Sequence, residues 1–181
     1  VLGLGDIGPK AGLPVMEGKA LLYKYLGGVD GVAIMLDTKD PDAIINTTLM
    51  LQPGFGGVNL EDISNPKCFY ILDTLREKAE IPIWHDDQQG TATVTLAGLI
   101  NALKVVGKDK EKVKVTFIGV GASNVAISRL IFSWGVQPAN CLMVDSKGIL
   151  GKHRKDLEMR KAEYVDKWKL CQITNEENRQ G

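Results

Sequence analysis

Short apolar runs alternate along the chain with segments in which apolar residues recur every three or four positions. The apolar runs are typical of buried parallel strands and cover residues 32–36, 81–84, 113–118 and 141–144. The periodic segments predict helices with one apolar face over residues 41–51, 66–79, 91–106 and 124–134. Strands that alternate with helices in this way predict an α/β fold built on a parallel sheet.

The two ends of the chain carry weaker patterns. Pro14 suits the first position of a helix, so the residues before it predict a glycine-rich loop. Beyond Gly151 charged residues dominate, and we expect a helix from Lys155 to Lys169. The chain starts inside a strand-like segment and ends without a closing element, so we interpret it as a fragment of a longer protein.

The composition argues against several classes of protein. Lys and Arg number 22, as do Asp and Glu, and this balance disfavours nucleic acid or an anionic membrane as the main partner. The longest apolar stretch, residues 94–106, is interrupted by polar residues and is too short to cross a bilayer. The three cysteines are far apart, so neither a disulfide framework nor a zinc knuckle is indicated. A cytoplasmic location fits these features best.

A G-x-G-x-x-G motif occurs at Gly3-Leu4-Gly5-Asp6-Ile7-Gly8. In a dinucleotide site the last glycine opens a helix whose amides face the pyrophosphate. Here Pro9 follows at once, and Gly12 and Pro14 are expected to delay any helix. We therefore interpret this motif as a tight loop beside another site.

A second glycine motif lies between a predicted strand and a predicted helix, the arrangement a dinucleotide site requires. Its residues are Gly119, Val120, Gly121, Ala122 and Ser123. Asn124 replaces the glycine that normally allows close helix–strand packing, so we expect looser packing but an open phosphate site.

The next predicted strand ends at Asp145, where a Rossmann unit places the acid that binds the ribose. A carboxylate at this point favours NAD. Ser146 and Lys147 follow it and could hold a 2′-phosphate, so the choice between NAD and NADP stays open with a slight preference for NAD.

Two pairs of acids, Glu61-Asp62 and Asp86-Asp87, each follow a short apolar run. Because the carboxyl ends of parallel strands face one crevice, these pairs could converge there. Close carboxylates repel one another unless a cation lies between them, and oxygen ligands favour Mg²⁺ or Mn²⁺. The alternative, equally weighted here, is that these acids only cap helices.

Lys19 and His85 are two further candidates. Helical spacing places Lys19 beside Met16, Leu22 and Tyr23, and an apolar setting can lower a lysine pKa enough for it to act as a base. The common alternative is a surface lysine that packs only its aliphatic stem. His85 is interpreted as a packed histidine without chemistry.

Four segments together closely resemble the malic enzyme family, in particular its compact prokaryotic type. They are VLGLGDIGPKAGLPVMEGK, LDTKDP, NLEDIS and HDDQQGTA, which begin at residues 1, 36, 59 and 85. The likeness runs from residue 1 to about residue 151 and differs at Gln89, where the family has histidine, and at Asn124.

The resemblance implies roles for several residues. Lys19 aligns with the general base, and Asp86 with a neighbour of the metal ligands. The residues aligned with ligands of Mg²⁺ or Mn²⁺ are Glu61, Asp62 and Asp87. The segment from Gly119 to Ser123 aligns with the loop that binds the pyrophosphate of NAD or NADP.

The resemblance to malic enzymes also implies a domain organisation and an activity. Residues 1–88 correspond to the end of a substrate- and metal-binding domain, and residues 89–181 to the start of a Rossmann domain, in a homodimer or higher oligomer. The reaction converts (S)-malate to pyruvate and CO₂ and reduces NAD(P). The family's catalytic tyrosine precedes Val1 and a binding asparagine follows Gly181, so the fragment alone is expected to be inactive.

Two other functions remain open. One is a nucleotide- or metal-binding module without turnover, because part of the catalytic set is absent. The other is a different metal-assisted NAD(P)-dependent dehydrogenase of hydroxy or amino acids, although the GLPVMEGK and HDDQ segments argue against it.

Overall fold

The first half of the chain combines three helices with a small parallel sheet. The computed structural model describes residue 1 and residues 3–181. The elements of this half are α1 (Gly8–Gly27), α2 (Pro41–Leu51), β1 (Val58–Leu60), α3 (Lys67–Lys78) and β2 (Ile83–His85). β1 and β2 pair in parallel with Leu60 opposite His85, so both strands end at the same edge.

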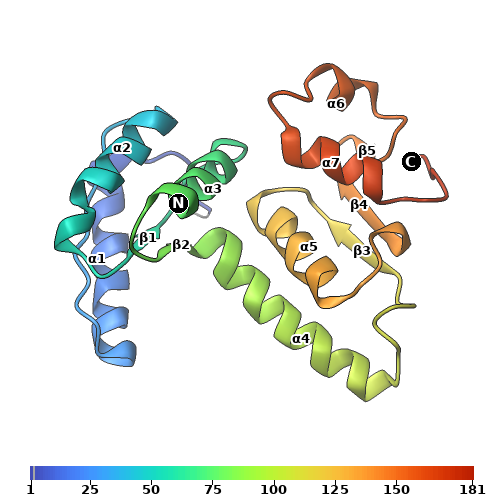
Figure 1. Cartoon of the computed structure of the whole chain (residues 1–181), viewed down its shortest axis with the longest axis horizontal. Helices are drawn as coiled ribbons and strands as arrows, with labels where there is room; N and C mark the ends of the chain where they lie inside the picture. The colour runs from blue at the N-terminus through green and yellow to red at the C-terminus, as the bar shows by residue number, and fades with distance from the viewer. Residues whose placement is uncertain (2) are drawn as a thin grey trace.

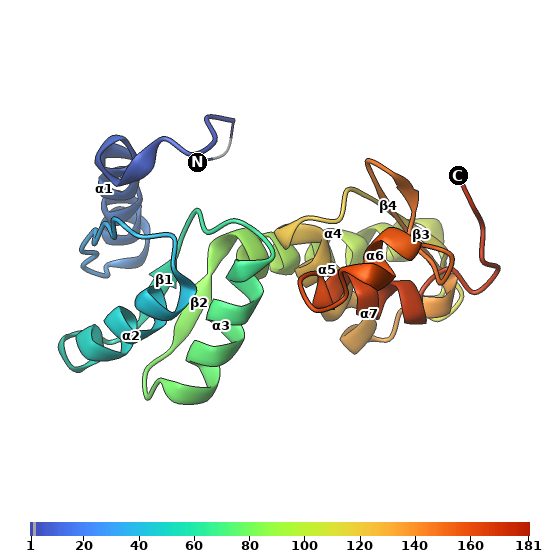
Figure 2. The ribbon, with the colours of Figure 1, turned by 90° about the horizontal axis from the view of Figure 1, so that it is seen from above.

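A π-helical turn, η2 (Asp86–Gly90), and the long helix α4 (Thr91–Val106) lead to the second half. Its elements are β3 (Val115–Ile118), α5 (Ala122–Trp134), β4 (Cys141–Asp145), β5 (Gly148–Ile149), α6 (Lys155–Met159) and α7 (Val165–Ile173). β3 pairs in parallel with β4, and β5 pairs antiparallel with β4. In both ribbon views α1 lies at one end of the molecule and the β3–β5 sheet toward the other, with α4 between them (Figures 1 and 2).

Local sequence explains where most helices begin and end. Asp40 caps α2 by accepting the backbone N–H of Asp42, and Pro41 occupies the first turn. α4 ends at Gly107, which adopts a left-handed conformation. α3 buries Cys68, Phe69, Leu72 and Leu75 at the predicted three- and four-residue spacing, and Ile71 as well.

The interior contains two hydrophobic clusters. One joins α2, α3 and the β1–β2 pair around Ile45, Ile71 and Leu75. The other surrounds α5 and the β3–β4 pair, with Ile131 and Met143 at its centre. The prediction of an α/β architecture with parallel strands is confirmed, but the strands form two separate sheets. No helix in the described part of the chain has both the length and the apolarity of a bilayer span.

Three predictions about individual elements are wrong. Residues 32–36 form no strand: no described strand pairs with them, and Val32 and Ile34 remain exposed. The second wrong prediction is the start of the first helix, which was expected at Pro14. The helix, α1, begins at Gly8, and Pro14 lies inside it. Pro9 is tolerated in the first turn, where its missing N–H breaks no helical bond.

The third wrong prediction concerns the charged segment beyond Gly151. It contains two short helices, α6 and α7, in place of one helix from Lys155 to Lys169. The break between them follows Met159, and Leu157 and Leu170 anchor the two helices separately in the core.

Candidate active site

Lys19 connects the carboxyl ends of the two paired strands. Glu61 directly follows β1 and Asp86 directly follows β2, and the parallel register brings these ends side by side. Lys19 reaches them from α1: it forms an ion pair with Glu61, and its Nζ donates to Asp86 Oδ2 at 3.1 Å. The Glu61 side chain is only 13% exposed, so this contact is largely shielded from solvent.

The second acids of the two pairs, Asp62 and Asp87, contact each other. The backbone N–H of Asp62 donates to Asp87 Oδ2 at 3.2 Å. Asp62 adopts a positive φ of 53°, a conformation in which aspartate is tolerated better than most residues. Asn59 donates to Glu61 Oε1 at 2.8 Å and thereby helps to orient this carboxylate.

The acids offer the oxygen ligands that Mg²⁺ or Mn²⁺ would require. Within the described residues, however, no three carboxylate, thiol or imidazole groups lie close enough together to hold a metal ion. Lys19 instead occupies the space between Glu61 and Asp86. The donors therefore fit a hard divalent cation in chemistry, while the Lys19 ammonium supplies the positive charge in this arrangement. Burial raises the pKa of the Cys68 thiol to about 12, which disfavours a thiolate ligand nearby.

His85 is fully buried at the end of β2, and neither ring nitrogen has a hydrogen-bond partner. Burial lowers its pKa, although the nearby Asp87 and Asp86 charges oppose this effect. His85 is therefore a buried histidine whose lowered pKa favours the neutral ring. Its backbone N–H donates to Gln89 Oε1, which helps to hold the η2 turn that carries Asp86 and Asp87.

The second glycine motif forms a tight turn between β3 and α5. Gly119 has a φ of +91°, and its N–H donates to Val144 O on the neighbouring strand at 2.7 Å. The turn is followed at once by the N-terminus of α5, whose free amides suit a phosphate. The Asn124 side chain donates to the carbonyls of Ile118 and Gly119, both at 2.9 Å, so it braces the turn where we expected looser packing.

The first glycine motif is a loop, as expected, although Gly8 does begin a helix. Gly3, Gly5 and Gly8 all have φ values between 72° and 78°, which favours glycine at each position. Residues 3–7 form turns and irregular structure, so no described strand precedes this helix. The motif lacks the strand–turn–helix arrangement of a dinucleotide site.

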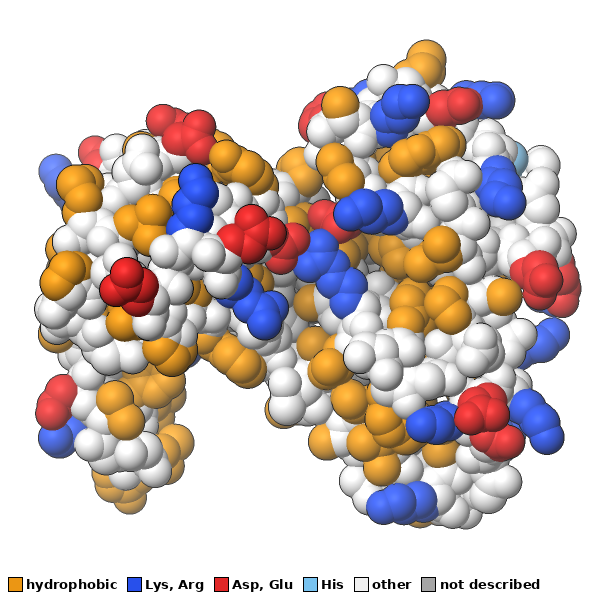
Figure 3. Space-filling model, in the orientation of Figure 1, with side chains coloured by type: hydrophobic (Ala, Val, Ile, Leu, Met, Phe, Trp, Pro, Cys, Tyr) orange, Lys and Arg blue, Asp and Glu red, His pale blue; other side chains and the backbone are white. Residues whose placement is uncertain are grey.

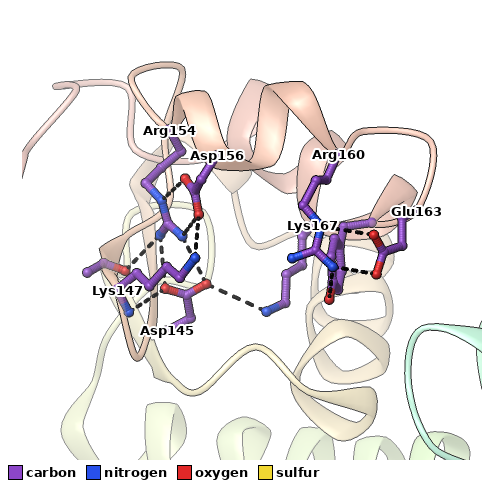
Figure 4. A network of polar contacts seen from close by, with 9 residues as sticks. Asp145, Lys147, Arg154, Asp156, Arg160, Glu163 and Lys167 are labelled. Carbon is purple, nitrogen blue, oxygen red and sulfur yellow. Dashed lines mark hydrogen bonds and ion pairs between the residues drawn. The ribbon is translucent and has the colours of Figure 1, made fainter.

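Asp145 ends β4, where the sequence placed it, and both oxygens of its carboxylate accept hydrogen bonds (Figure 4). Arg154 donates to Oδ1 at 2.9 Å and to Oδ2 at 3.2 Å, and the backbone N–H of Lys147 donates to Oδ1 at 2.9 Å. Burial would raise the pKa of Asp145, but the hydrogen bonds from Arg154 and Lys147 lower it overall.

Sequence reasoning missed three residues near this site. Arg154 holds Asp145, and Lys167 lies 3.6 Å from the same carboxylate. Asn65 faces the second glycine motif, since a Cβ on Gly121 would lie 3.9 Å from its Nδ2. The only signal for the first two was the high charge beyond Gly151, which does not reveal which charges meet.

The sequence of the chain matches those of known proteins. Residues 1–45 match the family described as "Malic enzyme, N-terminal domain", and residues 88–179 match "Malic enzyme, NAD binding domain". The NAD-dependent malic enzyme of Geobacillus stearothermophilus is 49% identical over 100% of this chain and 36% of its own length. The NADP-dependent malic enzyme of Haemophilus influenzae is 47% identical over 91% of this chain and 22% of its own length.

A solved structure agrees with this assignment. The crystal structure of Entamoeba histolytica malic enzyme superposes with a TM-score of 0.93 at 51% identity, and covers 100% of this chain and 38% of that one. The chain thus spans less than half the length of these relatives. The paired strands with their acids, the glycine turn before α5 and these matches lead to one conclusion: the chain belongs to the malic enzyme family.

Proposed function

We propose that the chain is part of an enzyme that oxidises (S)-malate and decarboxylates it to pyruvate and CO₂, with reduction of NAD or NADP. The observation that supports this most directly is the placement of Lys19 between Glu61 and Asp86 in a member of the malic enzyme family. It brings an amine to the same strand edge as the acids that the resemblance assigns to metal binding.

We propose Lys19 as the general base. Its Nζ lies at the strand edge that carries the acids, so as a neutral amine it would take the C2 hydroxyl proton of malate while hydride leaves C2 for the nicotinamide. Positioning of this kind is what proton transfer requires, because the base must lie within hydrogen-bond reach of the proton.

Glu61, Asp62 and Asp87 are the proposed ligands of Mg²⁺ or Mn²⁺. A divalent cation held there would polarise the C2 oxygen of the substrate and favour departure of the carboxylate as CO₂. The hydrogen bond from Asp62 N–H to Asp87 supports this set, because it links the ends of the two strands. Lys19 would have to release its carboxylate contacts as the cation binds.

The second glycine motif is the proposed cofactor site. Gly119, Val120, Gly121, Ala122 and Ser123 lead into the N-terminus of α5, and a pyrophosphate there would be bound by backbone N–H groups. Asp145 marks the ribose end of this site.

We also propose that the enzyme is cytoplasmic and forms a homodimer or higher homo-oligomer. The three cysteines are unpaired and buried, which supports a reducing compartment. The proposed division into residues 1–88 and 89–181 falls within the η2 turn.

The second candidate is a nucleotide- or metal-binding module without turnover. One observation favours its nucleotide-binding form: in the described residues, no three potential metal ligands surround a single point.

A metal-dependence assay decides between these functions. In the full-length enzyme that contains these residues, malate should yield pyruvate and reduced cofactor only with Mn²⁺ or Mg²⁺, and EDTA should abolish the rate. Asp87→Asn should raise the Mn²⁺ concentration required, whereas Asp30→Asn, at a side chain 84% exposed on the surface, should not. A rate that is insensitive to EDTA would contradict the metal site, and no rate in any condition would favour the binding module.

A further inference from the structure

Asn59 and Lys19 meet at one oxygen of Glu61. Asn59 lies in β1, two positions before Glu61, and its Nδ2 donates to Glu61 Oε1 at 2.8 Å. Lys19, from α1, forms its ion pair with the same oxygen. The carboxamide of Asn59 and the amine of Lys19 therefore lie side by side, although they come from different elements.

The other end of the Asn59 carboxamide has no partner. Its Oδ1 is buried and accepts no hydrogen bond from any described residue. The reverse orientation of the carboxamide is disfavoured, because it would direct this oxygen at the Glu61 carboxylate. Native structures rarely keep a buried polar atom without a partner, since its lost contact with water is not replaced. Asn59 Oδ1 is thus an acceptor whose donor is missing in this arrangement of the site.

The neighbouring strand is built in the same way. Trp84 lies opposite Asn59 in the parallel register, and its Nε1 donates at 3.4 Å to Oδ1 of Asp86, two positions further along the chain. The other oxygen of Asp86 accepts from Lys19. Each acid that holds Lys19 is therefore itself contacted by an N–H donor from within its strand. The shorter contact, and the free acceptor, belong to Asn59.

A divalent cation at Glu61 would displace the amine of Lys19. The cation and an ammonium group repel each other, and both depend on the same carboxylate. Asn59 Oδ1 offers Lys19 a neutral acceptor on the side chain that already shares Glu61 Oε1 with it. A lysine amine has N–H groups with or without its extra proton, so it can donate there before and after it takes a proton.

From these contacts we infer that Asn59 is a positioning residue for Lys19: its Nδ2 orients Glu61, and its Oδ1 accepts a hydrogen bond from Lys19 Nζ when a divalent cation occupies Glu61. This inference rests on the proposed function, which supplies the base and the metal ligands. It gives Lys19 a place at the strand edge once its carboxylate contact is lost, and it accounts for the free buried oxygen.

A structure of the full-length enzyme with Mn²⁺ tests the contact directly. Lys19 Nζ should lie within about 3.2 Å of Asn59 Oδ1, the usual limit of such a hydrogen bond. An amine still paired with Glu61 would overturn the inference, and so would Mn²⁺ bound to Asn59 Oδ1. This measurement needs no variant, so it remains decisive even if substitutions at Asn59 prevent folding.

A double-mutant cycle tests whether Asn59 acts through Lys19. At saturating Mn²⁺, Asn59→Leu should lower kcat for malate oxidation by about 10–100-fold, the usual loss when a residue behind a metal site is removed. The KM for the cofactor should stay within about twofold. In a Lys19→Ala background the same substitution should lower kcat by less than about threefold, because no amine is left to position. Equal losses in the two backgrounds would contradict the inference.

Mn²⁺ binding tests the contact with Glu61 separately. Titration followed by electron paramagnetic resonance should show an increase of about tenfold in the Kd for Mn²⁺ in Asn59→Leu, because Glu61 loses its hydrogen bond. Asn46→Leu is the matched control: Asn46 is exposed on α2, and its replacement should change neither the Kd nor kcat. An unchanged Kd in Asn59→Leu would show that Asn59 does not orient Glu61.

Urea denaturation separates positioning from a purely structural role. Asn59→Leu should not lower the midpoint of the metal-free enzyme, because it removes a buried acceptor without a partner together with one hydrogen bond. A lower midpoint with unchanged kcat would make Asn59 a structural residue and overturn the inference.

The outcomes also distinguish this inference from the proposed function. If malate is oxidised only with Mn²⁺ or Mg²⁺ but the two losses in the cycle are equal, the proposed function stands and the inference fails. If malate is not oxidised but the Mn²⁺ structure shows Lys19 on Asn59 Oδ1, the proposed function fails and the positioning contact stands.

Discussion

Lys19 shows how much of the site depends on single side chains. Its Nζ contacts Asp86, 67 positions further along the chain, and also Glu61. Only a residue with a long, flexible stem can reach two strand ends from a neighbouring helix, and its terminal amine can also exchange a proton. Position and chemistry together make it the residue on which activity should depend most.

Lys19→Ala in the full-length enzyme should lower kcat by at least about 100-fold, because general-base catalysis contributes that much or more. Cofactor affinity should change by less than about twofold, since Lys19 contacts no residue of the glycine motif. Steady-state kinetics and a cofactor titration check both values. Lys10→Ala, an exposed lysine on the same helix, should change neither, and an equal loss of kcat and affinity in Lys19→Ala would indicate a structural role.

Asp145 predicts a pH dependence of stability. Its folded-state pKa is lowered from the model-compound value of 3.8, so its stabilising contacts are fully present above that value and are lost as the pH falls through the folded pKa. Asp145→Asn should reduce the free energy of unfolding by about 1–3 kcal/mol at pH 6. Urea denaturation should show this difference shrink toward pH 2.

The control for this experiment is Asp30→Asn, which removes a carboxylate that is 84% exposed. It should change the free energy of unfolding by less than about 0.5 kcal/mol at every pH, as is usual for exposed pairs. A constant difference between wild type and Asp145→Asn from pH 6 to pH 2 would show that Asp145 does not contribute through its charge.

Among the elements, the turn between β3 and α5 requires a backbone conformation that favours glycine. Gly119 has a φ of +91°, which residues with a Cβ rarely adopt, and among the described residues the nearest atom to a Cβ there would be Asn124 Nδ2 at 3.7 Å. A substitution is therefore opposed by backbone strain and not by crowding. Asn124 fixes the same turn through its two carbonyl contacts.

Gly119→Ala should lower the free energy of unfolding by about 1–2 kcal/mol, the usual cost of a left-handed conformation in a residue with a Cβ. Gly98→Ala should instead raise it by about 0.5–1 kcal/mol, because Gly98 is inside α4 with open space around its Cβ position. Chemical denaturation measures both. Equal effects of the two variants would mean that the turn tolerates alanine.

At the level of the whole molecule, Arg129 joins elements from both halves. From α5 it donates to Asp73 on α3, at 3.4 and 3.5 Å, and to Asp166 on α7 at 2.7 Å. Its guanidinium group lies 5.5 Å from the ring centroid of Phe69. Figure 3 shows acidic and basic side chains next to each other on the surface where the two halves meet.

Arg129→Gln should lower the free energy of unfolding by about 1 kcal/mol, a modest value because the side chain is partly exposed. Arg160→Gln provides the comparison: the side-chain hydrogen bonds of Arg160 with described residues are to Glu163 and Tyr164, three and four positions away, so its loss should cost less than about 0.5 kcal/mol. Urea denaturation followed by circular dichroism distinguishes the two. A larger effect at Arg160 would contradict the bridging role of Arg129.

Features that depend on neighbouring residues were predictable from the sequence. The glycine turn followed by α5, the acids after β1 and β2, and the amphipathic face of α3 all follow from local spacing. The strand expected at residues 32–36 was wrong, because apolar residues alone do not supply a hydrogen-bonding partner. The engagement of Asp145 by Arg154 was missed, because a charged stretch does not indicate which charges will pair.

The sequence by itself determined the alternation of strands and helices, the two strand-end acid pairs and the likeness to malic enzymes, since each is written in short stretches of residues. Only the tertiary structure decided that Lys19 lies between Glu61 and Asp86, and that Arg154 donates to both carboxylate oxygens of Asp145. The physical reason is that packing of distant segments sets these contacts, and no local periodicity encodes the distance between two side chains on separate elements.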